Sequence, residues 1–301
     1  MDKINKHIFW ISSYPKSGNT LLRAILSSIF FTNDGLFNFE LLKNIPQIEN
    51  TINLEFIKNS NPKDYNEIHK LEVLSKYWET IQSKKNLEFE GDFIFIKTHH
   101  ALIEFLNNSF TSRSSTRGLI YVVRDPRDVV ISFAHHYNIS IDKSIDAVIN
   151  KNYKIEWQDP NNIFSSKKKP FTFLSSWDFH YESWVENPFG CPQLLIKYEE
   201  MISDKFSIIN NLIKFFENNY NFKFSNIDIK IKNIIESTDF QLLKKNEQKY
   251  GFSEAVNNKF FNIGTKNQWE NKLTKDQILK VEKRFYKLMK KLGYKTNYYN
   301  E

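Results

Sequence analysis

The sequence predicts a single α/β domain in which helices flank a central, mainly parallel β-sheet. Short runs of β-branched and aromatic residues at 7–13, 93–97 and 118–123 are typical of buried strands. Segments with apolar residues at helical spacing alternate with these strands, and this alternation favours parallel pairing in one sheet. A chain of 301 residues, 41% hydrophobic and 26% charged, can bury a large core and differs from a disordered protein.

The first strand runs into the loop YPKSGNT, residues 14–20, and the spacing of the apolar residues after it predicts a helix over about 18–31. Backbone amides of a glycine-containing turn at a helix N-terminus form a cradle for anions, to which Lys16 adds a positive charge. We therefore expect a P-loop-like phosphate-binding unit. It is not a Walker A sequence, because Lys16 precedes Gly18. The alternative is an ordinary helix cap by Ser17 or Thr20, with Lys16 in solvent.

The elements after this unit follow from local patterns. The segment 71–81 reads as helical, and DPRDVVISFAHHY (125–137) predicts a helix with Asp125 as N-cap and Pro126 in its first turn. Residues 159–171 are typical of a loop, and 193–201 contain a short strand that we expect to be buried. Further helices are predicted at 173–185, 207–219 and 274–293.

Polar clusters stand at the carboxyl ends of the predicted strands, where ligands bind in parallel sheets. They are the 14–20 loop, Lys97 to His100, Arg124, and Tyr198. A histidine beside Lys97 can take a proton near neutral pH, but His99 and His100 point in different directions in an extended chain. Either histidine can instead be structural.

Arg124 closes the third strand, and Ser132 lies eight residues later in the following helix. Both can reach one phosphate from different sides. The alternative is an ion pair between Arg124 and Asp128.

Net charge and composition limit the classes of partner that the protein can bind. A formal charge of +7 and a pI near 9.1 predict anionic partners such as a phosphorylated small molecule, nucleic acid or an acidic membrane surface. No nucleic-acid recognition motif is present, and no apolar run approaches the roughly 20 residues of a membrane span. Cys191 is the single cysteine, so no intrachain disulfide can form. We expect a cytoplasmic protein without stable membrane insertion.

Taken together, the motifs resemble the PAPS-dependent sulfotransferases, which transfer a sulfuryl group from 3′-phosphoadenosine 5′-phosphosulfate (PAPS) to a hydroxyl or amine. The loop YPKSGNT is similar to that family's 5′-phosphosulfate loop, and YVVRDPRDVVISF is similar to its 3′-phosphate motif. KTH after the second strand, KYEEM, STDFQLLKK and GTKNQWENKLT follow in the family's order. The pattern SGNTLLR…KTHHAL…TRGLIYVVRDPRDVVISFAHH looks closest to bacterial members. The resemblance implies one cytosolic-type sulfotransferase domain over residues 1–301.

The resemblance also implies roles for individual residues. His99 is the expected general base, with Lys97 beside the transferring group and Lys16 at the leaving oxygen. Arg124 and Ser132 would bind the 3′-phosphate. The residues that would hold the 5′-phosphosulfate are Lys16, Ser17, Gly18, Asn19 and Thr20. The residues expected beside adenine and in the C-terminal motif are Tyr198, Thr238, Phe240, Asn262, Gly264 and Lys266.

Two departures from the family pattern stand out. Leu21 replaces a tryptophan after the phosphate loop, and Asn262-Ile263 replaces an Arg-Lys pair that helps to clamp the 3′-phosphate, with Lys266 close by as a substitute. PAPS is the expected donor co-substrate, and no metal is expected. The alternatives are a nucleotide-dependent phosphoryl transferase, a non-catalytic nucleotide-binding relative and a nucleic-acid-binding protein. The acceptor, be it a small molecule, glycan or lipid, is left open, as is the oligomeric state.

Overall fold

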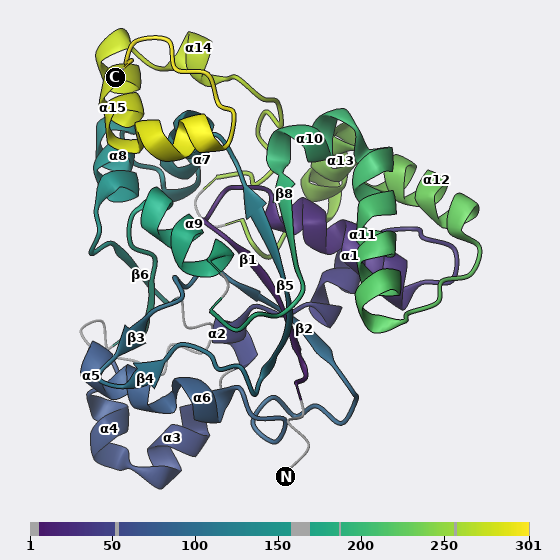
Figure 1. The fold of residues 1–301 in the computed structure, drawn as a ribbon, viewed down its shortest axis with the longest axis vertical. Coiled ribbons are helices and arrows are strands. Elements are labelled where there is room, and N and C mark those ends of the chain that lie inside the picture. The colour runs from purple at the N-terminus through teal and green to yellow at the C-terminus, as the bar shows by residue number, and fades with distance from the viewer. Residues whose placement is uncertain (1–5, 52–53, 158–168, 187, 256–257, 301) are drawn as a thin grey trace.

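The central sheet has the strand order β2-β1-β5-β8, and all its strands are parallel (Figure 1). The computed structural model describes residues 6–51, 54–157, 169–186, 188–255 and 258–300. In it, β1 (Ile8–Ser13) lies between β2 (Ile94–Thr98) and β5 (Thr116–Val123), and β8 (Gln193–Lys197) pairs with β5. The predicted parallel sheet is confirmed, and the carboxyl ends of its strands share one edge.

One expectation about the sheet is wrong. The fourth strand was expected to be buried, but β8 pairs on one side only, and the side chain of Leu195 is 40% exposed. An edge strand needs only partial burial, because one side and part of one face remain open to solvent.

Helices cover both faces of the sheet and form a hydrophobic core on each. Along β1, Ile8 and Trp10 face one core while Phe9 and Ile11 face the other, as the alternation of a strand requires. The Phe9 core is covered by α1 (Asn19–Phe31), α10 (Tyr198–Ser203), α11 (Lys205–Tyr220) and α12 (Ile227–Ser237). The Trp10 core is covered by α7 (Pro126–Tyr137), α8 (Ile141–Ile149), α9 (Trp177–Val185) and α15 (Lys275–Lys291) (Figure 1).

Short elements complete the fold. The short helix η1 (Phe39–Asn44) packs against α1. On the side of the Trp10 core lie α2 (Ile48–Thr51), α3 (Leu54–Ser60), α4 (Pro62–Asn66), α5 (Leu71–Leu74), η2 (Ser75–Tyr77) and α6 (Trp78–Ile81). Two hairpins are β3 (Glu104–Phe105) with β4 (Asn108–Ser109), and β6 (Lys154–Glu156) with β7 (Phe171–Phe173). The C-terminal part adds α13 (Phe240–Tyr250) and α14 (Trp269–Lys272). None of the helices in these described ranges combines the length and apolar character that crossing a membrane requires.

Element boundaries agree with the sequence except around β7. Asp125 caps α7 by accepting a hydrogen bond from the amide of Arg127, with Pro126 at the first position, as predicted. The helix predicted over 173–185 begins only at Trp177, because Phe171–Phe173 pairs with β6. Most of the loop predicted over 159–171 falls outside the described residues.

A buried ion network joins α7 to the C-terminal elements. The Arg127 guanidinium lies 2.6 Å from Asp125 Oδ2 and 2.6 Å from Glu282 Oε1, and all three side chains are almost fully buried. The guanidinium also lies 3.7 Å from the centre of the Trp269 ring. The Glu282 carboxylate accepts hydrogen bonds from the amides of 297–299. One carboxylate therefore fixes both the start of α7 and the segment after α15.

Glu282→Ala is expected to lower the free energy of unfolding by about 3–5 kcal/mol, because it leaves Arg127 only partly paired in the core. Urea denaturation would measure this loss. Lys280→Ala, which removes the exposed pair with Asp146, is the control and should cost less than about 1 kcal/mol. Equal effects of the two variants would contradict a structural role for the network.

Candidate functional site

A cavity of about 1190 Å³ opens at the carboxyl-end edge of the sheet. Residues that follow each of the four strands line it: Lys16 after β1, His99 after β2, Arg124 after β5 and Tyr198 after β8. Further lining residues come from α1, α2, α3, α7, α10, α11, the β6–β7 hairpin and described residues between 238 and 268. The polar clusters predicted from sequence thus meet around one space, as the parallel topology requires.

The loop after β1 leaves the helix N-terminus open. Lys16 (φ 67°) and Gly18 (φ 102°) both adopt left-handed backbone conformations, and no side chain caps α1. A Cβ atom at Gly18 would lie 2.4 Å from Cδ2 of Tyr198, so only glycine fits here. The predicted alternative, an ordinary cap by Ser17 or Thr20, is wrong, because the first-turn amides remain available to an anion.

The polar side chains of the loop divide between the cavity and the core. Lys16, Gly18, Asn19 and Thr20 line the cavity. Asn19 Nδ2 also donates to the Ile11 carbonyl (3.2 Å), which ties the helix to the strand. The Ser17 hydroxyl is fully buried beneath the loop, without a hydrogen-bond partner among the described residues, and does not line the cavity.

Lys16 is a cation in crowded positive surroundings. Its Nζ lies 3.7 Å from the centre of the Phe260 ring and 3.4 Å from His136 Nδ1. Burial, with the charges of Lys97 and Arg124, lowers the pKa of Lys16 to about 7 despite the opposing Glu254. Burial and Lys16 also lower the pKa of His136 to about 3, so this imidazole is neutral at pH 7.

His99 is oriented for proton transfer at the cavity. Its Nδ1 lies 2.8 Å from the Ser13 carbonyl and therefore carries the proton, which leaves Nε2 with a free lone pair. Nε2 has no hydrogen-bond partner in the described part of the chain. Burial, followed by the charge of Lys97, lowers the pKa of His99 well below its usual value, so the ring is neutral near pH 7. His180 Nε2 lies 3.0 Å from the His99 carbonyl and supports the main chain there.

His100 turns away from the cavity. Its ring stacks on Phe110 with centres 4.1 Å apart, its Nδ1 lies 2.6 Å from the Ala101 carbonyl, and only 3% of the residue is exposed. Of the two histidines between which the sequence could not choose, His99 lines the cavity and His100 does not.

Arg124 joins the loop after β1 to the backbone at Thr265. Its guanidinium donates to the carbonyls of Lys16 (3.1 Å) and Thr265 (3.2 Å) and lies 4.3 Å from the centre of the Tyr198 ring. Asp128 Oδ2 lies 3.8 Å from it, so the alternative ion pair is also present. The Asp128 carboxylate accepts hydrogen bonds from the amides of 267 and 269, and burial raises its pKa to about 6. Ser132 lines the cavity from α7.

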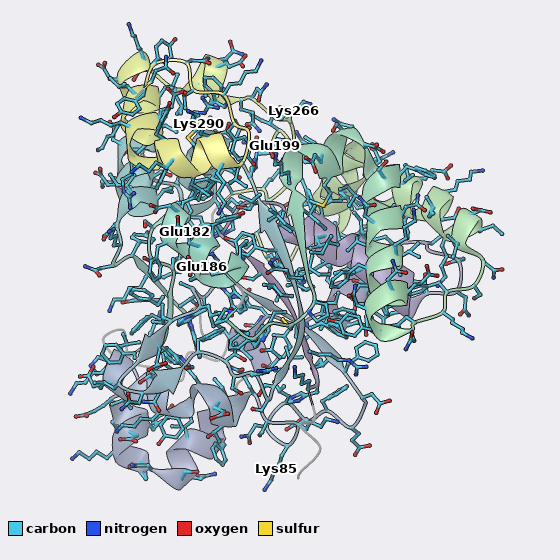
Figure 2. All side chains as sticks on the ribbon, viewed as in Figure 1. Lys85, Glu182, Glu186, Glu199, Lys266 and Lys290 are labelled. Atoms are coloured by element: carbon cyan, nitrogen blue, oxygen red, sulfur yellow. The ribbon has the colours of Figure 1, made fainter. Side chains whose placement is uncertain are left out.

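The residues predicted beside adenine also lie at the cavity. A Cβ atom at Gly264 (φ 75°) would lie 2.3 Å from the Phe240 ring, and Tyr198 Oη donates to the Gly264 carbonyl (3.2 Å). The Thr238 hydroxyl is engaged by the Ile234 carbonyl (2.6 Å). Asn262 and Lys266 line the cavity; Lys266 is exposed, has no ion pair within the described ranges, and is marked in Figure 2.

Some cavity residues were missed by sequence reasoning. Glu254 contacts Thr20, Arg23 and Lys97 from a segment far along the chain. Lys205 lines the cavity and donates to the Thr238 carbonyl (2.9 Å), and Glu49 accepts from the Thr172 hydroxyl (2.6 Å). No local motif marks these residues, because each owes its place to tertiary packing. Within the described ranges, no three His, Cys, Asp or Glu side chains are grouped as metal ligands would be.

The site defines a class of protein: an α/β fold in which an uncapped helix N-terminus, clustered cations and a neutral histidine meet at one cavity. Comparison with known proteins gives the family. Residues 6–293 match the model of the sulfotransferase domain, and the chain therefore belongs to this family.

Individual relatives are distant in sequence, but the similarity spans most of this chain. Luciferin sulfotransferase of Photinus pyralis is 23% identical over 285 residues, which are 90% of this chain and 69% of that protein. Sulfotransferase 1 family member D1 of Mus musculus is 24% identical over 294 residues, or 93% and 82% of the two chains.

Solved structures share the fold. A mouse sulfotransferase complexed with PAP has a TM-score of 0.54 at 18% identity, covering 94% of this chain and 84% of that one. Retinol dehydratase in complex with androsterone and the inactive cofactor PAP has a TM-score of 0.56 at 15% identity, covering 94% and 80%.

The pKa of Lys16 predicts a pH-dependent affinity for anions. A bound anion favours the charged form of the Lys16 amine. The affinity for inorganic sulfate should therefore be highest well below pH 7, where the amine is charged, and about tenfold lower at pH 8 than at pH 6. Calorimetric titration across this range would measure the change. Lys16→Arg keeps the charge but does not titrate, so its affinity should vary little; the same pH dependence in both proteins would exclude Lys16 as the cause.

Proposed function

We propose that the protein transfers a sulfuryl group from PAPS to an acceptor hydroxyl or amine. The observation that carries this proposal is the neutral His99, whose Nε2 is free at the same cavity as the open helix amides and Lys16. Membership of the sulfotransferase domain family supports it. PAP, present in the two solved neighbours, is the product that PAPS leaves after sulfuryl transfer.

The reaction follows from the chemistry of the lining residues. The acceptor oxygen attacks sulfur in line, the bond from sulfur to the bridging oxygen of PAPS breaks, and His99 Nε2 takes the acceptor proton. Charge then accumulates on the bridging oxygen, where Lys16 and the first-turn amides of α1 stabilise it. Lys97, which lines the same cavity, stabilises the sulfuryl oxygens during transfer. PAP leaves as the second product.

The donor's nucleotide would lie across the ends of β5 and β8. Arg124, at the end of β5, and Ser132, in α7, would contact the 3′-phosphate from two sides. Lys266 would supply the positive charge that Asn262-Ile263 lacks. Both neighbours of Lys266 are held, since the Thr265 carbonyl bonds Arg124 and the amide of residue 267 bonds Asp128. Phe240 and Tyr198 offer aromatic surface to adenine.

The rest of the cavity would receive the acceptor. This part of the cavity is lined by Glu49, Ile155, Trp157 and Thr172, among others. A cavity of this volume exceeds the needs of one nucleotide and leaves space for a small molecule or one end of a larger acceptor. The names of relatives, such as luciferin sulfotransferase, agree with small-molecule acceptors.

The donor assignment is tested by calorimetric titration with PAP, with ADP and ATP as controls and magnesium omitted. PAP should bind at least about tenfold more tightly than ADP, because a charged hydrogen-bonding group reads the 3′-phosphate. Lys266→Ala should remove much of this preference while ADP affinity stays constant, and Lys272→Ala serves as the matched surface control. Equal binding of PAP and ADP would favour the phosphoryl transferase instead.

The proton-transfer assignment is tested with His99→Ala. Loss of the general base should reduce turnover by about a hundredfold or more. PAP binding, followed by calorimetry, should remain, because the imidazole is not assigned to the nucleotide. A variant with full turnover would remove His99 from the mechanism, and a wild-type protein that binds PAP without turning over any acceptor would indicate a non-catalytic relative.

A further inference from the structure

The carboxylate of Glu254 lies beside the phosphate loop, among groups that favour an anion. Its Oε2 accepts a hydrogen bond from the Thr20 hydroxyl (3.0 Å) and lies 3.4 Å from Lys97 Nζ. Its Oε1 forms an ion pair with Arg23. The contacts to Glu254 therefore come from a hydroxyl and two cations, the kind of donor set that proteins use for sulfate and phosphate groups.

Two nitrogens of the Arg23 guanidinium are held by backbone carbonyls, and the third contacts Glu254. Its Nε donates to the Ile45 carbonyl (2.9 Å) and its Nη2 to the Leu42 carbonyl (2.9 Å), while Nη1 meets Glu254. Arg23 lies one helical turn after Thr20 on α1, so both side chains act on the same face. Arg23 does not itself line the cavity, whereas Glu254 does. The carboxylate thus lies between the guanidinium and the cavity.

The charges explain why a carboxylate is stable there. Burial alone would raise the pKa of Glu254, but Lys97 and Arg23 outweigh it and hold the pKa well below its usual range. Burial lowers the pKa of Lys97, and Glu254 is the first group that opposes this effect. A buried lysine without an anion loses its proton easily. Glu254 therefore keeps the site charged while no ligand is bound.

We propose that Thr20, Arg23 and Lys97 form an oxyanion subsite, which Glu254 fills in the free protein and which the terminal sulfuryl group of the donor takes over. The assignment to the sulfuryl group rests on the proposed function; the subsite itself does not. Arg23 then becomes a donor-binding residue, and Glu254 a competitor that donor binding displaces. A tetrahedral oxyanion replaces one carboxylate, so the subsite keeps its charge balance.

The test compares wild-type protein with Glu254→Gln, and Glu156→Gln is the control. Glu156 also lines the cavity, is exposed, and forms no ion pair in the described part of the chain, so its loss reports the general effect of one negative charge. Calorimetry measures inorganic sulfate, PAP and PAPS, without acceptor. Glu254→Gln should bind sulfate and PAPS about tenfold more tightly, and PAP, which has no sulfuryl group, should gain much less. Glu156→Gln should leave the ratio of PAPS to PAP affinity unchanged.

The variants also separate the two proposals. In the double variant Arg23→Gln/Glu254→Gln the increase in sulfate affinity should vanish. If the increase persists, Arg23 is not part of the subsite. Unchanged sulfate affinity in Glu254→Gln would overturn the subsite, even if PAP binds. Tighter sulfate binding without any binding of PAP or PAPS would keep the subsite and overturn the donor assignment. If Glu254→Gln is less stable, the rise of its melting temperature with sulfate, relative to wild type, gives the same comparison.

Discussion

The buried guanidinium of Arg127, paired with Asp125 and Glu282 over the ring of Trp269, is the interaction on which the geometry of the site depends. It fixes the first turn of α7 against α14 and α15. Arg124, just before this turn, and Asp128, within it, hold the segment 265–269 by its backbone. An unpaired charge at this depth is so costly that the three elements are placed together or not at all.

The rest of the site is held by backbone contacts to a few rigid side chains. The ring of Tyr198 lies so close to Gly18 that only glycine fits there, and the ring of Phe240 has the same effect at Gly264. Tyr198 also donates a hydrogen bond to the Gly264 carbonyl. Arg124 bonds carbonyls of the first loop and of the C-terminal segment. Segments that are far apart in the sequence thus form one wall of the cavity. Burial first, and then the neighbouring cations, lower the pKa values of Lys16 and Lys97, and an anionic ligand opposes both effects.

Much of the fold and part of the site could be predicted from sequence, because they depend on local patterns. Strand ends, the cap at Asp125 and the loop after β1 are set by neighbouring residues. The burial of the Ser17 hydroxyl was not predictable, since it follows from the left-handed turns at Lys16 and Gly18. β7 was missed because its partner strand decides it. The edge position of β8 and the contacts of Glu254 depend on segments that meet only in the folded protein.

The place of β1 in the sheet has a kinetic consequence. Its residue Ile8 pairs with Ile94 and Thr116, so both neighbours of this wholly buried strand follow much later in the chain. Contacts of such large sequence separation slow folding, because loop closure must precede the stabilising pairing. During synthesis β1 leaves the ribosome long before its partners. A strand of this composition is then prone to aggregation, and the yield of folded protein should depend on chaperones that shield it.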